Sequence, residues 1–166
     1  MEIRFCTRLD AAAICEIYNH YVETSVVTFE EKLVTCSEME SRIAGTSKQF
    51  PWLVAQVDQD IVGYAYATAW KPRSAYRHSV ETTVYLRNSQ KGKGLGFMLY
   101  RRLIDELRQQ NFHCLIAGIS LPNEASIRLH EKLGFEKVAH FKQVGRKFER
   151  WIDVGYWQLV LNEKQC

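Results

Sequence analysis

Three glycines separated by single residues stand between a β-rich segment and a helical one, in SQKGKGLG at residues 89–96. Closely spaced glycines let successive backbone N–H groups turn toward one ligand, and the N-terminus of the following helix adds partial positive charge. Lys91 and Lys93 bring cationic side chains to the same loop. These features predict an anion site, most often for a phosphate. The alternative is a tight turn without a ligand, which does not require three glycines.

The loop differs from two common phosphate-binding motifs. The nucleotide-triphosphate loop has a Lys-Ser/Thr pair after its last glycine, and no such pair follows Gly96. The dinucleotide fingerprint has another glycine spacing and occurs in the first βα turn of a parallel sheet. The sequence therefore indicates a phosphate loop of a different kind.

A carboxylate in the segment before the loop is the second candidate for chemistry. Glu81 lies in VETTVYL, residues 80–86, where the other side chains are apolar, hydroxylated or aromatic. Partial burial in a polar cleft would raise the pKa of this carboxyl toward that of a useful general base. A solvent-facing glutamate on an edge strand is the alternative. Strand alternation places Glu81, Thr83 and Tyr85 on one face, and Thr82, Val84 and Leu86 on the other.

The elements that must position these residues follow from hydrophobic periodicity. We expect a strand over 2–6, a helix after Asp10, and a second helix opened by a capping box of Ser37 and Glu40. Residues 52–57 and 61–70 read as a hairpin. The strongest helix spans 95–110, since leucines at 95, 99, 103 and 107 repeat every fourth residue.

The remaining pattern completes a single domain over 1–166. We expect strands over 80–86 and 113–119, a helix from Asn123 to near Gly134, and strands in 135–161 around a turn at Gly145. Strands and helices in this order predict a mixed α/β domain.

Bulk properties exclude several classes of protein. The formal net charge of +3 with mixed signs argues against nucleic acid, and no apolar run approaches the roughly 20 residues that span a membrane. The five cysteines and five histidines lack the spacing of a metal site. We expect a cytoplasmic protein with reduced thiols and no bound metal.

The glycine loop resembles the pyrophosphate loop of the GNAT acetyltransferase superfamily, of the form Arg/Gln-x-x-Gly-x-Gly/Ala. Lys91 stands where that frame usually has Arg or Gln, which conserves the charge. The resemblance implies a GNAT-like fold, with a central, mostly antiparallel twisted sheet flanked by helices. It also implies acetyl-CoA as cosubstrate.

A narrower resemblance covers nearly the whole chain. The stretches NHYVETS (19–25), PWLVA (51–55), VETTVY (80–85), LPN (121–123), SIRLHE (126–131) and WIDVGYWQ (151–158) are similar to phosphinothricin N-acetyltransferases. This group implies N-acetylation of small amino-acid analogues such as phosphinothricin, methionine sulfoximine or methionine sulfone. It also implies a homodimer.

The resemblance extends to individual cofactor positions. In GNAT enzymes the pantetheine arm pairs with the strand before the loop, here at Val84 and Leu86, and a backbone N–H there is the expected oxyanion donor. Asn123 matches a cofactor-contacting position and is equally suited to cap a helix. The implied cofactor-binding residues are Val84, Tyr85, Leu86, Lys91, Gly92, Lys93, Gly94, Leu95, Gly96, Phe97 and Asn123.

The implied catalytic residues are Glu81, Tyr85 and His130. Glu81 aligns with the family's general base and would act directly or through water. A free thiol has a pKa of about 8.5, so a weak acid suffices to protonate the leaving thiolate. Tyr85 and His130 both remain candidates, and His130 has the alternative of a packed helix residue.

The implied substrate-binding residues are Thr28, Phe29, Lys71, Arg73, Tyr76 and Glu81. Arg73 offers a planar guanidinium that suits a carboxylate or phosphinate, although it is equally a residue type of solvated loops. Phe29 is as well suited to a core as to a pocket. Two other hypotheses stay open: a different acceptor, such as an aminoglycoside, polyamine or protein N-terminus, and an acyl-CoA sensor without turnover. The basic segment 70–77 disfavours a polycationic acceptor.

Overall fold

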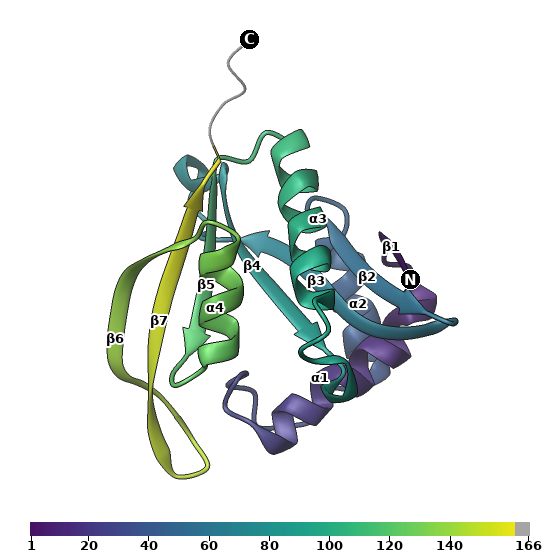
Figure 1. Ribbon diagram of the computed structural model, residues 1–166, viewed down its shortest axis with the longest axis horizontal. Coiled ribbons are helices and arrows are strands. Elements are labelled where there is room, and N and C mark those ends of the chain that lie inside the picture. Colours follow the sequence, from purple (N-terminus) through teal and green to yellow (C-terminus); the bar gives the residue numbers. More distant parts are fainter. Residues whose placement is uncertain (162–166) are drawn as a thin grey trace.

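The computed structural model describes residues 1–161, so Cys166 and the end of the predicted domain lie outside the described residues. Helices and strands follow the predicted order (Figure 1). They are β1 (Glu2–Phe5), α1 (Ala11–Thr24), α2 (Cys36–Thr46), β2 (Trp52–Val57), β3 (Asp60–Ala69), β4 (Ser79–Leu86), α3 (Leu95–Gln109), β5 (Cys114–Ser120), α4 (Glu124–Lys132), β6 (Glu136–Lys147) and β7 (Arg150–Val160).

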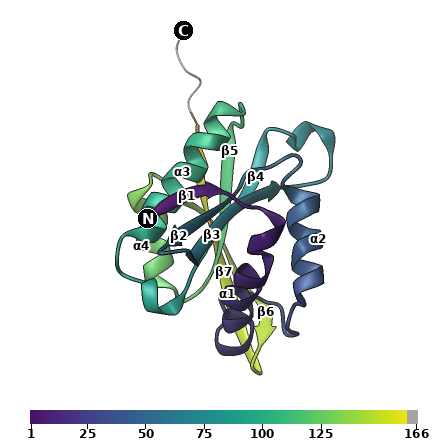
Figure 2. The ribbon, with the colours of Figure 1, turned by 90° about the vertical axis from the view of Figure 1, so that its right-hand side faces the viewer.

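The strands form one seven-stranded sheet in the order β1-β2-β3-β4-β5-β7-β6. Every neighbouring pair is antiparallel except β4 and β5, which are parallel. The prediction of a mixed α/β domain around a mostly antiparallel sheet is confirmed. Figure 2 shows α2 on one side of the sheet and α3 on the other.

Each face of the sheet carries its own apolar core. Leu99, Leu103 and Leu107 of α3 are fully buried against one face, as their spacing predicted. On the opposite face, α1 and α2 cover Trp52, Val54 and Tyr64. Because successive strand residues alternate between the faces, both sides of β4 contact packed side chains.

The parallel pair opens partway along its length. Backbone pairing of β4 with β5 runs only from Ser79–Cys114 to Glu81–Ile116, and beyond that point the two strands diverge (Figure 1). At the point of divergence the Thr82 hydroxyl lies 3.3 Å from the Ile116 carbonyl. The divergence leaves the second half of β4 with one unpaired edge in the middle of the sheet.

Two local predictions are wrong. The capping box of α2 is formed by Thr35 and Glu38 rather than by Ser37 and Glu40, because the helix begins at Cys36 and Thr35 accepts from the Glu38 amide. The final hairpin turns at residues 148–149, which both adopt positive φ, and not at Gly145, which lies inside β6.

No helix within residues 1–161 is long and apolar enough to cross a membrane.

Candidate active site

The glycine loop leads directly into the strongest helix. Gly92 and Gly94 both adopt φ of +78°, a left-handed conformation that costs a side-chain-bearing residue energy. Gly94 is the N-cap residue of α3, so the free N–H groups of the first helical turn lie at the loop. A Cβ at either glycine would meet nothing within 4 Å. Glycine is therefore required at both positions because of the backbone conformation. An anion-binding loop needs such a conformation to turn its amides toward one ligand.

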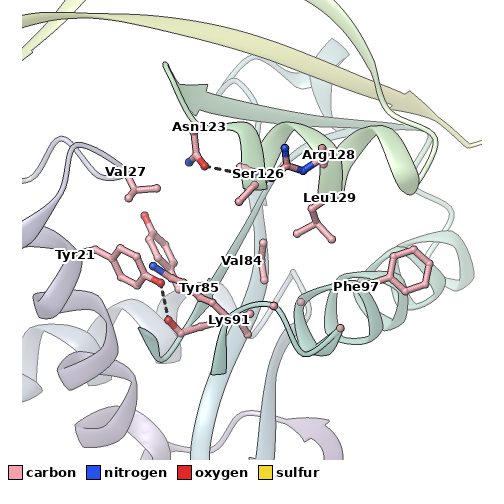
Figure 3. A pocket seen from close by; sticks show the side chains of 15 residues that line it. Tyr21, Val27, Val84, Tyr85, Lys91, Phe97, Asn123, Ser126, Arg128 and Leu129 are labelled. Carbon is pink, nitrogen blue, oxygen red and sulfur yellow. Dashed lines mark hydrogen bonds between the residues drawn. The ribbon is translucent and has the colours of Figure 1, made fainter. Parts of the chain in front are cut away.

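A cavity of about 400 Å³ lies between this loop, the end of β4 and the start of α4 (Figure 3). In Figure 3, Val84, Tyr85 and Lys91 lie on one side and Asn123, Ser126 and Leu129 on the other. The lining residues are Tyr21, Val27, Val84, Tyr85, Leu86, Lys91, Gly92, Gly94, Gly96, Phe97, Asn123, Ala125, Ser126, Arg128 and Leu129.

Two of the predicted cofactor residues do not line this cavity. The Lys93 ammonium donates to the Gln90 side chain at 3.1 Å on the surface of the loop. Leu95, the first residue of α3, packs into the apolar core. Lys91 does line it, and its ammonium lies 4.8 Å from the Tyr21 ring centroid, a cation–π distance. Lys91 is therefore the loop lysine that faces the cavity.

The unpaired edge of β4 faces the same cavity. The Arg87 amide donates to the Val62 carbonyl and the Trp70 amide to the Ser79 carbonyl, so odd-numbered residues of β4 direct their backbone groups toward β3. Val84 and Leu86 therefore direct theirs away from β3, toward the opening beside β5. The Tyr21 hydroxyl already donates to the Leu86 carbonyl at 2.6 Å. The amides of Val84 and Leu86 remain exposed to an extended ligand along the strand.

A smaller cavity of about 60 Å³ continues into the opening between β4 and β5. It shares five lining residues with the larger one: Val27, Val84, Tyr85, Asn123 and Ser126. Thr82, Thr83, Gly118 and Ser120 line its inner part. The two cavities form a continuous cleft from the glycine loop to the centre of the sheet.

Glu81 lies at the last backbone pair before the strands diverge and lines neither cavity, but its carboxylate lies beside Gly118, which lines the smaller one. Its carboxylate is partly buried, and a Cβ at Gly118 would lie 3.6 Å from its Oε1 and 3.3 Å from the Tyr156 ring. Burial raises the pKa of Glu81, and the nearby Lys71 ammonium opposes that rise. The pKa of Glu81 is thus moved in the direction that a general base needs.

The two candidate acids differ in their surroundings. Tyr85 lines both cavities, and burial raises the pKa of its hydroxyl well above the usual range, although the Thr28 side chain lowers it. His130 is buried, its Nδ1 lies 2.7 Å from the Ser126 carbonyl and its Nε2 lies 3.1 Å from the Tyr100 hydroxyl.

A carbonyl only accepts, so Nδ1 of His130 carries the proton and Nε2 accepts from Tyr100. Burial lowers the pKa of His130, which keeps the ring neutral. The Tyr100 hydroxyl lies 2.6 Å from the Thr82 hydroxyl, and both His130 and Thr82 line the smaller cavity. His130 thus has hydrogen-bond partners for both nitrogens and also borders the cleft.

Asn123 fulfils both of its expected geometries. It is the N-cap residue of α4, where its Oδ1 accepts from the Ser126 amide at 3.2 Å. It also lines both cavities. The cap fixes the side chain at the mouth of the cleft.

The predicted acceptor residues lie in two separate segments. Thr28 is buried and its hydroxyl lies 2.7 Å from that of Tyr18, while Phe29 packs on Gly145. Arg73 stacks over the Tyr76 ring at 5.8 Å in an exposed loop before β4. Lys71 of that loop lies over Trp70 at 4.7 Å. None of these lines either cleft cavity.

The sequence did not identify several cleft residues. Tyr21 and Val27 come from α1 and the segment after it, and their apolar character indicated only a core helix. Arg128 and Leu129 line the cavity from α4. Tyr156 lies beside Glu81 across Gly118, and the glycine inside β5 was the available signal for this close approach.

Within residues 1–161, no group of three or more His, Cys, Asp or Glu side chains could hold a metal ion.

A cavity that adjoins a glycine loop and a helix N-terminus suits a phosphate-bearing cosubstrate, and the sequence of the chain matches one protein family. The family profile described as an acetyltransferase (GNAT) domain matches residues 3–155. The chain belongs to the GNAT acetyltransferase family and is an N-acetyltransferase.

Similar proteins cover nearly all of the chain. Phosphinothricin N-acetyltransferase of Streptomyces viridochromogenes is 42% identical over 95% of this chain and 86% of its own length. The L-methionine sulfoximine/L-methionine sulfone acetyltransferase of Salmonella typhimurium is 41% identical, over 98% of this chain and 96% of its own length. The crystal structure of a phosphinothricin acetyltransferase from Sinorhizobium meliloti in complex with AcCoA has 35% sequence identity and a TM-score of 0.95. The match covers 99% of this chain and 90% of that chain.

Proposed function

We propose that this chain transfers the acetyl group of acetyl-CoA to the α-amine of small amino-acid analogues such as phosphinothricin, methionine sulfoximine and methionine sulfone. One observation carries the proposal: two cavities that share five lining residues follow the unpaired edge of β4, from the glycine loop to Gly118, beside which the Glu81 carboxylate lies. The names of the similar proteins, at about 40% identity, support the acceptor class.

The residues of the cleft fit acetyl-CoA. The amides of the loop at Gly92 and Gly94 and the first turn of α3 suit a diphosphate, because helix N-termini bind anions. The amides of Val84 and Leu86 suit a pantetheine arm that pairs with β4 as an added strand. Acetyl-CoA supplies an acetyl group activated as a thioester.

Three groups of the chain would serve the transfer. Glu81 accepts a proton from the acceptor ammonium, directly or through water, because burial raises the pKa of its carboxyl. The Val84 amide donates to the oxyanion that develops on the acetyl oxygen. Tyr85 stays protonated at neutral pH and donates a hydrogen bond to the leaving sulfur.

His130 has a secondary role in this proposal. Its neutral ring accepts from Tyr100, which in turn lies against Thr82 at the point where β4 and β5 diverge. It supports the shape of the cleft rather than protonating the thiolate. The assignment of the acid to Tyr85 rests on its place in both cavities.

The acceptor would lie beside the segment after α1, which the β6–β7 hairpin contacts directly at Gly145 and Lys147. Thr28 and Phe29 form one wall, and Lys71 is the cation whose field reaches Glu81. Arg73 and Tyr76 lie at the outer loop, where a guanidinium can pair with the acceptor carboxylate. A polycationic acceptor is disfavoured, because it would meet this basic loop.

The proposal includes a cytoplasmic homodimer. Several large apolar side chains of the β6–β7 hairpin are exposed: Val138, Phe141, Val144, Phe148 and Trp151. An apolar group of this size on a protruding hairpin is a common subunit interface. The four described cysteines are free thiols, which suits a reducing compartment.

A thiol-release assay with acetyl-CoA and a panel of amines tests the proposal. The panel contains phosphinothricin, methionine sulfoximine, methionine sulfone, the common amino acids, polyamines and aminoglycosides. Release is expected with the first three compounds and not with polyamines or aminoglycosides. A preference for aminoglycosides would overturn the acceptor assignment, and acetyl-CoA binding without release to any amine would favour a sensor.

A further inference from the structure

Lys147, the last residue of β6, is buried although it is a lysine. Its side chain is 2% exposed, and its ammonium donates to the backbone carbonyl of Thr28 at 2.9 Å. Lysine is almost never fully buried unless it is paired, because desolvating an ammonium is costly. Burial lowers the pKa of Lys147, and Glu31 and Glu30 oppose that effect. Lys147 and Thr28 lie 119 positions apart in the chain. A contact between them that is kept despite the cost of desolvating the ammonium indicates a structural role.

A second contact joins the same two segments. Gly145 of β6 lies directly against the Phe29 ring, so that a Cβ on this glycine would overlap the ring. The segment after α1 is thus held by the hairpin at two consecutive residues, Thr28 and Phe29. Because this segment carries the proposed acceptor wall at Thr28 and Phe29, these contacts set where that wall lies.

Hydrogen bonds join Thr28 to the two helices that cover this face of the sheet. The Tyr18 hydroxyl of α1 donates to Glu30 at 2.9 Å, which leaves its oxygen to accept from the Thr28 hydroxyl at 2.7 Å. Arg42 of α2 holds Glu30 with two contacts from its guanidinium. A shift of Thr28 would therefore disturb the wall that α1 and α2 support.

We infer that Lys147 is a positioning residue, which ties the segment at Thr28–Phe29 to the β6–β7 hairpin and thereby fixes the acceptor wall of the site. Its effect on the acceptor rests on the proposed function. The tie itself is a property of the fold. Lys147 contacts the wall and not the cofactor cleft, so it sets acceptor binding and leaves acetyl-CoA binding unchanged.

Steady-state kinetics of Lys147→Met test this inference, because methionine keeps an apolar stem and removes the ammonium. The KM for the amine is expected to rise about tenfold or more, as for loss of a charged hydrogen bond, with the KM for acetyl-CoA unchanged. Lys147→Arg, which keeps a cationic donor, is expected to recover part of the loss. Lys142→Met on the same strand is the control, since Lys142 is exposed.

Hydrogen exchange of residues 25–35 gives a readout that needs no turnover. Exchange there is expected to accelerate in Lys147→Met and not in Lys142→Met. If Lys147→Met does not fold, Gly145→Ala displaces the Phe29 ring while keeping Lys147, and the same selective rise in amine KM is expected.

Unchanged exchange in this segment, or equal rises in both KM values, would overturn the inference. If the wild-type protein acetylates no amine of the panel, the proposed function fails, and the exchange measurement still decides whether Lys147 ties the two segments.

Discussion

Glu81 is a carboxylate whose surroundings differ from those of a surface glutamate. It lies beside Gly118 and Tyr156 where β4 and β5 part, and Lys71 is the cation that acts on it. Burial favours the neutral carboxyl and the cation favours the carboxylate, with burial the larger effect. The net rise in pKa is the direction that the proposed role as general base requires.

Replacing Glu81 by glutamine removes the base while keeping the shape of the side chain. We expect kcat/KM for the amine to fall about 10²- to 10⁴-fold, the usual contribution of a general base. The dissociation constant for acetyl-CoA, measured by calorimetry, should stay the same, because Glu81 does not line the larger cavity. Full activity in Glu81→Gln would remove this residue from the chemistry.

The pH dependence follows from the direction of the pKa shift. Only the ionised carboxylate accepts a proton, so kcat/KM should fall as the pH drops through a pKa above the ordinary 4.5 of a glutamate. Lys71→Met removes the charge that lowers this pKa, and the acid limb of the profile should move to higher pH. Lys48→Met, a distant exposed site, serves as the control. An acid limb that stays in place in Lys71→Met would refute the electrostatic argument.

Among the elements, the loop before α3 depends most on its backbone conformation. Gly94 adopts φ of +78° at the N-cap, so Gly94→Ala should cost about 1 kcal/mol of unfolding free energy and raise the KM for acetyl-CoA. Gly45→Ala is a matched control, because Gly45 lies inside α2 with open space around it. That change should stabilise the fold by about 0.5–1 kcal/mol. Denaturant unfolding and acetyl-CoA titration distinguish the two, and equal effects would contradict the role of the loop.

Local signals predicted the elements better than their contacts. The leucine repeat of α3 and the glycines at 92 and 94 each have one dominant interpretation, and the structure has the helix and the turn at these positions. The turn at residues 148–149 was missed because neither Phe148 nor Glu149 is a residue that favours positive φ. The open edge of β4 depends on where β5 ends its pairing, which no local pattern contains.

The candidate site likewise contains residues that the sequence indicated and residues that only the packing of the elements reveals. Glu81 was identifiable as a carboxylate out of place in a strand. His130 was not resolved by sequence, because its partners Ser126 and Tyr100 are known only once α3 and α4 pack together. Tyr21 and Val27 reach the cavity from the other end of the chain. The sequence thus indicates which residues could take part in chemistry, whereas only the long-range packing of the structure selects among these candidates.

At the scale of the whole molecule, the exposed apolar side chains of the β6–β7 hairpin predict a dimer. Trp151 is 61% exposed on this hairpin, so Trp151→Glu should convert a dimer to a monomer in light scattering. Leu9→Glu is the control, because Leu9 is 93% exposed but lies outside the hairpin. A wild-type monomer, or a dimer that Trp151→Glu leaves intact, would contradict a hairpin interface.

In the proposed function, one ligand occupies the cleft from the glycine loop to the opening between β4 and β5, beside Glu81. A crystal structure with bound CoA measures this directly. We expect the diphosphate within hydrogen-bonding distance of the amides at residues 92–96, and the thiol in the opening between β4 and β5 near Glu81. A CoA molecule bound elsewhere, with these amides facing solvent, would contradict the central claim.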